Sequence, residues 1–356
     1  MTGPFDDAAR SYDAVLVVSF GGPEGPEDVS PFLDNVLRGL DVPPRVKAAI
    51  ARRYDRFGGV SQINAETRAF VDALRSELVM RGPALPVYLG NRNWDPLLKD
   101  TMRTMAAEGV RRAIACITSV FGSYNGCRKY REDLFEASQV VEDPPVIDRL
   151  RLGFNHPGFI EAMAGRVRAA LERLPTERRP ETALVFTAHS LPEAMAKLNP
   201  YQAQLAESCA LVASTLGHHG WELAYQSRNA PYGEPWLGPE ISEAFMDARK
   251  RGVKDVIVAP IGFVSDHLEV VLDLDIEARA KAEEIGLNFI RAATVGAHPA
   301  YVRMMRDLII ERMTVNPARP ALGSMGPAPD VCRADCCLSG RTASPKPALC
   351  GTDAPA

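Results

Sequence analysis

Short apolar runs separated by amphipathic segments constrain the fold of this chain more than any other feature. Six of these runs predict buried strands, at residues 14–19, 87–90, 113–119, 184–188, 223–226 and 256–262. Helical periodicity marks the intervening segments 67–80, 97–108, 159–174 and 200–216. Continuous apolar strands that alternate with helices are typical of parallel sheets covered on both faces, so we expect an α/β fold.

The two halves of the chain resemble each other. Residues 14–24 resemble residues 183–193, and the segment 88–94 resembles 225–229 together with Trp236. This weak repeat predicts two Rossmann-like lobes with a cleft between them and a tail. The expected boundaries are 1–150 for the first lobe, 151–315 for the second and 316–356 for the tail. In such folds ligands bind beyond the carboxyl ends of the strands.

Composition excludes several classes of function. A hydrophobic content of 46% and a charged content of 24% suit a globular protein with a full core. The net charge of -4 argues against nucleic acid as the main partner, because phosphate binding favours a basic surface. No apolar run approaches the ~18 residues of a membrane span. Residues 1–12 lack the order of a signal peptide, so we expect a cytoplasmic protein.

His189 is the first candidate for chemistry, because it directly follows the strand 184–188. At such a position a histidine can simply bond to the backbone of a helix entry. It can also serve as a metal ligand or a general base, since neutral imidazole does both near pH 7. Position alone leaves both interpretations open.

The segment that follows the strand 256–262 is the most informative. A helix is expected to begin near Asp266, which has capping-box spacing to Glu269. Glu269, Asp273 and Glu277 recur at i, i+4 and i+8, so a regular helix puts them on one face of an otherwise apolar segment. Such a line is either a route for a cation or a solvated stripe. His267 could meet Glu269 at the helix start, and imidazole with carboxylate is a reasonable ligand set for Fe(II).

Two further features narrow the class of protein. Trp236 lies in a Pro/Gly-rich loop, where it either pins the loop or stacks on a flat aromatic ligand. The segment 20–23 after the first strand is not a phosphate fingerprint, and the chain has no P-loop and no nucleophile elbow. These absences remove the common nucleotide-enzyme interpretations of an α/β fold.

The chain has seven cysteines, and four of them crowd its end. Cys116 and Cys209 lie in apolar stretches and are expected in the core. The terminal four are Cys332, Cys336, Cys337 and Cys350. In a reducing cytoplasm such a cluster more often binds metal than forms disulfides. The proline-rich tail around it is expected to be largely disordered without a cross-link.

At these residues the chain closely resembles the ferrochelatases. The resemblance runs in family order from about residue 13 to residue 310. Its motifs are Ser19–Glu24, Arg53–Tyr54, Gly58–Ser61, Ser123–Asn125, Ala188–Pro192, Pro235–Pro239 and Gly262–Glu269. The pair formed by Ala188–Pro192 and Gly262–Glu269 is highly specific.

The resemblance implies a role for each matching residue. His189 and Glu269 are expected to face each other across the cleft, where they bind the metal and deprotonate the pyrroles. Asp273 and Glu277 continue Glu269 outward as a route for ferrous iron, which is the substrate metal. The positions expected to contact the porphyrin or its propionates are Arg38, Arg53, Tyr54, Ser61 and Tyr124, with Trp236 as a possible stacking surface. Phe20 departs from some bacterial members, which have a tyrosine that can ligate the product iron, so any axial ligand here must differ.

The tail is also similar to that of several ferrochelatases, which carry a [2Fe–2S] cluster on three C-terminal cysteines and one internal cysteine. Cys127 is the best internal candidate. Five thiols for four positions leave one spare, expected to be Cys336 or Cys337, and two thiolates per iron are normal for such clusters. A zinc site is the alternative.

The resemblance to the soluble bacterial branch favours coproporphyrin III over protoporphyrin IX. Coproporphyrin carries four propionates, and the segment 22–38 is acidic and polar with no membrane anchor. The product would be Fe-coproporphyrin III, passed to a later enzyme of the haem pathway. The alternatives are a protoporphyrin IX ferrochelatase, a cobalt or nickel chelatase, a non-catalytic haem-binding protein and a cluster-carrying electron-transfer protein.

Overall fold

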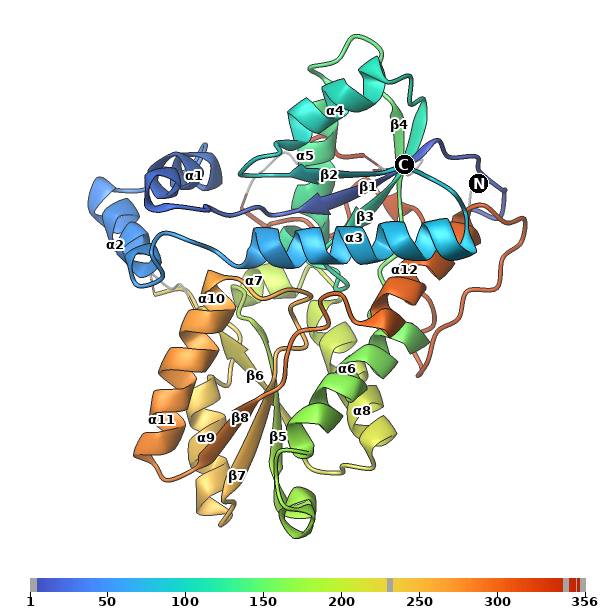
Figure 1. The fold of residues 1–356 in the computed structure, drawn as a ribbon. Coiled ribbons are helices and arrows are strands. Elements are labelled where there is room, and N and C mark those ends of the chain that lie inside the picture. The colour runs from blue at the N-terminus through green and yellow to red at the C-terminus, as the bar shows by residue number, and fades with distance from the viewer. Residues whose placement is uncertain (1–4, 229–232, 342–345, 350, 353–356) are drawn as a thin grey trace.

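Two four-stranded parallel sheets form the two lobes of the molecule (Figure 1). The computed structural model describes residues 5–228, 233–341, 346–349 and 351–352. The strand order is β2-β1-β3-β4 in the first sheet and β6-β5-β7-β8 in the second. The strands of these two sheets are β1 (Ala14–Ser19), β2 (Val87–Asn91), β3 (Arg112–Ile117), β4 (Val146–Arg149), β5 (Ala183–His189), β6 (Trp221–Gln226), β7 (Asp255–Ala259) and β8 (Asn288–Arg291). The tail adds a two-stranded parallel pair, β9 (Cys332–Arg333) and β10 (Gly351–Thr352). The shared order confirms the two-lobed α/β prediction.

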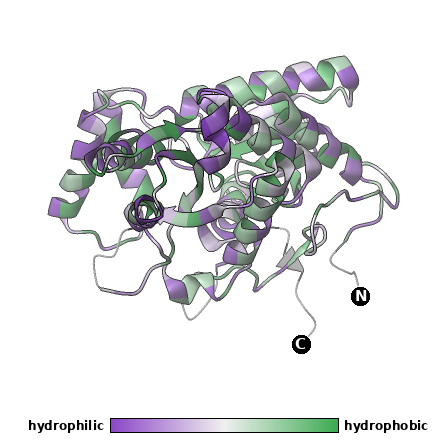
Figure 2. Ribbon diagram, turned by 90° about the horizontal axis from the view of Figure 1, so that it is seen from below, coloured by the Kyte–Doolittle hydropathy of each residue, from purple (hydrophilic) through white to green (hydrophobic). Residues whose placement is uncertain are grey.

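Helices connect the strands and cover both faces of each sheet (Figure 1). In the first lobe and its surroundings they are α1 (Val29–Val36), α2 (Pro44–Asp55), α3 (Ile63–Arg81), α4 (Leu98–Ala107) and α5 (Lys129–Ser138). The rest are α6 (Pro157–Leu171), α7 (Glu193–Ala196), α8 (Tyr201–Leu216), α9 (Ile241–Lys250), α10 (Leu268–Val270), α11 (Arg279–Glu284) and α12 (Pro299–Arg312). Figure 2 shows hydrophilic and hydrophobic residues mixed along the helices, as expected for helices with one face on a core.

Four short segments have other helical geometries. Two are 3₁₀-helices, η1 (Pro26–Asp28) and η3 (Thr176–Glu181). The other two are π-helices, η2 (Tyr124–Arg128) and η4 (Val271–Ala278). Single-turn π segments are rare and often occur at functional sites.

The six predicted strands are confirmed, but two further strands of the four-stranded sheets escaped prediction. These are β4 and β8, and both lie at an edge of their sheet. Each has four residues and ends in arginine, and β4 also contains Asp148. Because charged residues interrupt such short runs, neither segment shows the continuous apolar pattern of the central strands.

Helix α12 joins the two lobes. It packs against α3 of the first lobe and against α6, and the ring of Tyr301 lies 5.6 Å from that of Phe70. One continuous cluster of buried residues includes Val15 of β1 and Phe186 of β5. The lobes therefore share a core, and the domain boundaries expected from the sequence stay a prediction.

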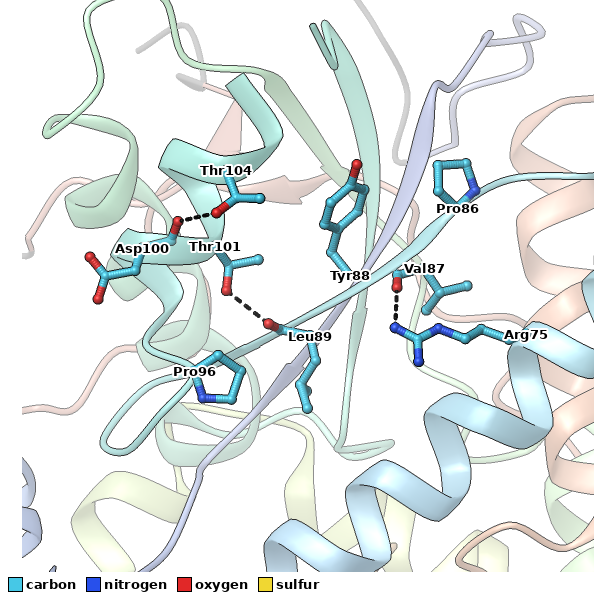
Figure 3. Close-up of a pocket in the computed structure, with 9 residues that line it drawn as sticks. All are labelled: Arg75, Pro86, Val87, Tyr88, Leu89, Pro96, Asp100, Thr101 and Thr104. Atoms are coloured by element: carbon cyan, nitrogen blue, oxygen red, sulfur yellow. Dashed lines mark hydrogen bonds between the residues drawn. The ribbon is translucent and has the colours of Figure 1, made fainter. Parts of the chain in front are cut away.

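The open edge of β2 is capped by side chains. A hollow of about 540 Å³ lies along this strand, between α3 and α4 (Figure 3). Arg75 Nη2 donates to the Val87 carbonyl at 2.8 Å, and Thr101 Oγ1 donates to the Leu89 carbonyl at 2.8 Å. Satisfied carbonyls make a poor template for a foreign strand, so the hollow protects a sheet edge.

The expectation of a disordered tail is wrong for its described residues. These residues lie against both lobes, since Arg128 of the first lobe donates to the Ala334 carbonyl and Glu207 of α8 accepts from Ser324. Buried side chains hold their backbone. Arg151 donates to the Pro320 carbonyl at 3.0 Å, and Asp330, only 2% exposed, lies between Arg312 and Arg319. Hydrogen bonds to fixed polar side chains thus replace the periodic apolar burial that the sequence lacks.

Candidate active site

His189 and Glu269 meet at the carboxyl ends of neighbouring strands. His189 is the last residue of β5, and Glu269 lies in α10, which follows β7. His189 Nε2 and Glu269 Oε2 are 3.7 Å apart, with side chains 32% and 44% exposed. Both residues belong to the second lobe, so the expectation that they face each other across the cleft is wrong. They form one pair on one wall.

The surroundings of His189 fix its tautomer. His189 Nδ1 lies 2.5 Å from the Ser190 carbonyl, and because a carbonyl only accepts, Nδ1 carries the hydrogen. In the neutral form of the ring, the lone pair is therefore on Nε2, the atom nearest Glu269. The buried Tyr201 hydroxyl donates to the His189 carbonyl at 3.0 Å and anchors the backbone. An oriented Nε2 suits both a metal ligand and a proton acceptor.

His267 has the opposite arrangement. It is the N-cap of α10, and its Nδ1 accepts a hydrogen bond from the Glu269 backbone N–H at 3.2 Å. The ring packs edge-on against Phe263 at 5.1 Å, and burial lowers the pKa of His267, so the ring stays neutral. Its hydrogen is then on Nε2, which can only donate. His267 shapes the helix start and offers no lone pair to a metal.

The predicted helix start needs correction. The helix begins at Leu268 rather than near Asp266, and His267 replaces the expected capping box. Asp266 instead binds Arg291 of β8 through two hydrogen bonds, at 3.0 and 2.8 Å. Arg291 Nε also donates to Asp275 at 2.7 Å. This arginine therefore ties the loop before α10 to the π-helix η4.

The carboxylate line runs along α10 and η4. Asp273 is half-buried, and Gln226 and Ser227 donate to its carboxylate. Burial raises the pKa of Asp273 to about 6, and the charges of Glu269 and Glu277 act in the same direction. Glu277 is exposed. The line thus leads from the partly exposed pair past a half-buried acid to the surface, which supports a cation route over a solvated stripe.

An aromatic cluster of the first lobe lies near this pair. Tyr54 of α2 is close enough that the charge of Glu269, after burial, raises the pKa of its hydroxyl. Its ring lies 5.8 Å from that of Phe32, which lies 6.2 Å from that of Phe20. Phe20 and Tyr54 therefore belong to one aromatic cluster beside the His189–Glu269 pair.

Sequence reasoning missed Arg92. This residue directly follows β2, and its guanidinium lies 5.3 Å from the ring centre of Phe20 and 4.5 Å from that of Tyr130. It also pairs with Asp133, and its charge acts on Tyr124. Its position at a strand end was the only signal in the sequence. Arg92 is a cation placed between the aromatic cluster and Tyr124.

The other predicted contact residues differ in accessibility. Arg38 and Arg53 are exposed, the first just beyond the end of α1 and the second on α2. Ser61 is only 5% exposed, and its backbone N–H donates to the Pro23 carbonyl at 2.9 Å. Trp236 is half-buried and forms a backbone bridge with Pro192, near His189. The stacking role of Trp236 stays a prediction.

The cysteines of the tail meet Cys127. The Cys332 thiol contacts those of Cys127 and Cys336, which in turn contacts Cys337. Hydrogen bonds from Cys127 and Cys336 lower the pKa of Cys332. The charge of Cys337 also acts on Cys127. Among the described residues, no group of three His, Cys, Asp or Glu is arranged to hold a metal ion. Cys350 lies outside the described residues.

Two lobes with parallel sheets and a His–Glu pair at the strand ends define a chelatase-type α/β protein. Solved structures share this fold. SirB from Bacillus subtilis with Fe³⁺ aligns with a TM-score of 0.54 at 11% identity, over 84% of this chain and 96% of that one. A Deinococcus radiodurans protein with structural similarity to chelatases gives 0.52 at 15% identity, over 88% of this chain and 56% of that one. At these identities the likeness concerns the fold alone.

Sequence comparisons identify the family. The ferrochelatase family profile matches residues 12–313. A ferrochelatase from Rhodopirellula baltica is 47% identical over 92% of this chain and 93% of its own. A coproporphyrin III ferrochelatase from Streptomyces coelicolor is 44% identical over 98% of both chains. The chain belongs to the ferrochelatase family.

Proposed function

We propose that this chain inserts ferrous iron into coproporphyrin III and produces Fe-coproporphyrin III for haem biosynthesis. The observation that carries the proposal is the pair of His189 Nε2 and Glu269 Oε2 at 3.7 Å, set at the start of a carboxylate line. Family membership and relatives named for coproporphyrin III support it.

The pair suits the steps that metallation demands. Ferrous iron must lose water, and the porphyrin must lose two N–H protons. Nε2 of His189 and the carboxylate of Glu269 are a ligand set for Fe(II) and are also proton acceptors. Asp273, whose pKa lies near 6, exchanges protons readily close to neutral pH and connects the pair to Glu277. A site that favours a distorted ring would speed insertion and release the flatter product.

The choice of porphyrin rests on charge around the site. Arg38 and Arg53 are exposed cations, and each charge-assisted bond to a propionate contributes about 1.5–3 kcal/mol where water is excluded. Coproporphyrin has two more propionates than protoporphyrin, and these can bind the two arginines. Within the described residues, no helix has the length and apolar content needed to cross a membrane. A cytoplasmic location and transfer of the product to a later haem-pathway enzyme belong to the same proposal.

The test is anaerobic Fe(II) insertion measured side by side with coproporphyrin III and protoporphyrin IX. We expect a higher kcat/KM for coproporphyrin. An equal or higher value for protoporphyrin would favour the alternative substrate, and porphyrin or haem binding without turnover would favour a non-catalytic haem-binding protein.

We also propose a [2Fe–2S] cluster on four of the five cysteines Cys127, Cys332, Cys336, Cys337 and Cys350. The contacts among the four described thiols support it. Arg131 supports it independently. This residue is 0% exposed, and its described partners are the Leu349 carbonyl and the Cys336 sulfur.

A buried guanidinium needs a nearby anion, and iron-bound thiolates would supply one. Purified protein should contain about two irons and two sulfides per chain. Colourless protein with one zinc would establish the alternative metal site. Bound to the thiolates, the cluster would supply a cross-link between the tail and the first lobe.

A further inference from the structure

A continuous row of hydrogen bonds links the tail to Tyr124. Arg128 Nη1 donates to the Ala334 carbonyl, and Nη2 donates to the Lys346 carbonyl at 2.7 Å. Arg128 Nε donates to Glu132 Oε1 at 3.1 Å. The other carboxylate oxygen of Glu132 accepts from the Tyr124 hydroxyl at 3.1 Å. The row begins beside the tail cysteines and ends at a predicted porphyrin contact.

The middle of this row is sealed from water. Arg128 is 2% exposed and Glu132 is 5% exposed. In such surroundings an ion pair is strong only while its remaining polar atoms are satisfied, and the tail carbonyls satisfy the guanidinium. If the tail moved away, a buried charge would lose its partners. The position of Glu132 therefore depends on the docked tail.

The direction of the last hydrogen bond decides what Tyr124 can do. Burial, followed by the charge of Glu132, raises the pKa of Tyr124 to about 12, so the hydroxyl is neutral at physiological pH and has one hydrogen. That hydrogen goes to Glu132. A propionate only accepts, so Tyr124 cannot donate to it while bound to Glu132. The residue is left with its ring as the surface that it presents.

We propose that Glu132 is a positioning residue of the porphyrin site: it holds the Tyr124 ring in place, and Arg128 makes this hold depend on the docked cysteine tail. The inference rests on the porphyrin substrate proposed above. It gives the tail a role in substrate binding rather than in metallation, because the His189–Glu269 pair lies on the other lobe.

The test is a double-mutant cycle with Glu132→Gln and Tyr124→Phe. We measure KM and kcat with coproporphyrin III, its dissociation constant by porphyrin fluorescence, and the visible absorbance of the cluster. Each single variant should weaken porphyrin binding about fivefold, since one charge-assisted bond is lost. The cluster should stay in place, kcat should stay within about twofold, and the double variant should be no weaker than the weaker single.

The opposite pattern is equally distinct. If Tyr124 donates to a propionate, Tyr124→Phe weakens binding while Glu132→Gln leaves it unchanged or tightens it. That result overturns the proposal. Tyr124→Phe removes only a hydroxyl and should fold normally. If Glu132→Gln folds poorly, the dissociation constant and kcat of Tyr124→Phe still test the proposal.

Dependence on the tail is tested with Cys332→Ser, which should remove the cluster. We expect it to weaken porphyrin binding about fivefold in the wild type and to add nothing in Glu132→Gln. Additive effects would separate the tail from Tyr124 and contradict the proposal. If the wild type binds coproporphyrin but does not metallate it, the proposed reaction fails, and the dissociation constants still decide the cycle.

Discussion

The two π-helices occupy equivalent places in the two lobes and do different work. In sheets of the same strand order, η2 follows β3 and η4 follows β7. The η2 segment contains Tyr124, Cys127 and Arg128, and its last two residues are buried. The η4 segment contains Asp273 and Glu277, which lead outward. A π-helical segment at the same place in each lobe therefore docks the tail in the first lobe and presents carboxylates in the second.

Charge pairing explains the difference. In the second lobe, Asp266 and Asp275 pair with Arg291. Among the described residues, Asp273 and Glu277 make no ion pair with lysine or arginine, although they lie on the same segment. In the first lobe, Glu132 is neutralised by Arg128. Acids paired with arginine hold structure, whereas Asp273 and Glu277 keep the unpaired carboxylates that the proposed iron route requires.

The largest expected effect separates the two histidines. His189→Asn should lower kcat for Fe(II) insertion by at least about 100-fold, because the Nε2 ligand and base is lost. His267→Asn is the matched control. Asparagine is a good N-cap, so this variant should keep most of the activity. Equal losses in two folded variants would contradict the tautomer assignment.

The second effect tests the docking role of η2. Cys127→Ser should abolish the cluster absorbance and the bound sulfide, and Cys332→Ser and Cys350→Ser should do the same. Cys116→Ser changes a cysteine that is equally buried but lies in β3, so it should retain about two irons per chain. Single changes at Cys336 or Cys337 should show which thiol is spare. A fully loaded Cys127→Ser protein would exclude this residue as a ligand.

The third and smallest effect is a pH dependence of the free energy of unfolding, which arises from Asp273 in η4. The folded pKa of Asp273, about 6, lies above its ordinary value of 3.8, so the folded state binds this proton more tightly. The resulting stability is fully present below about pH 4 and is lost as pH rises through 6, up to about 2–3 kcal/mol. Asp273→Asn should therefore be more stable than the wild type at pH 8 and equal at pH 4.

Urea unfolding at the two pH values measures this difference. Glu277→Gln, at an exposed position, is the control and should follow the wild type at both. If Asp273→Asn keeps the wild-type pH dependence, the carboxylate is more solvated than the structure indicates.

The sequence predicted the parts that depend on regular patterns. The apolar runs placed His189 and Glu269 after the ends of two buried strands, and the motifs indicated the family. It could not show that the pair lies on one wall, because the spacing of β5 and β7 is tertiary. The π-helix η4 also went unpredicted. Acids spaced at i and i+4 are compatible with an α-helix and with a π-helix, so their spacing does not distinguish the two. Arg92 and Glu132 escaped because single charged residues carry no periodic signal.

The most direct test of the central claim is Glu269→Gln. This change keeps the shape of the side chain and removes the charge that faces His189 Nε2. The account predicts that the variant binds coproporphyrin III as the wild type does, measured by fluorescence, but inserts Fe(II) at least about 100-fold more slowly under anaerobic conditions. Insertion at the wild-type rate by the folded variant would show that the reaction takes place without this carboxylate.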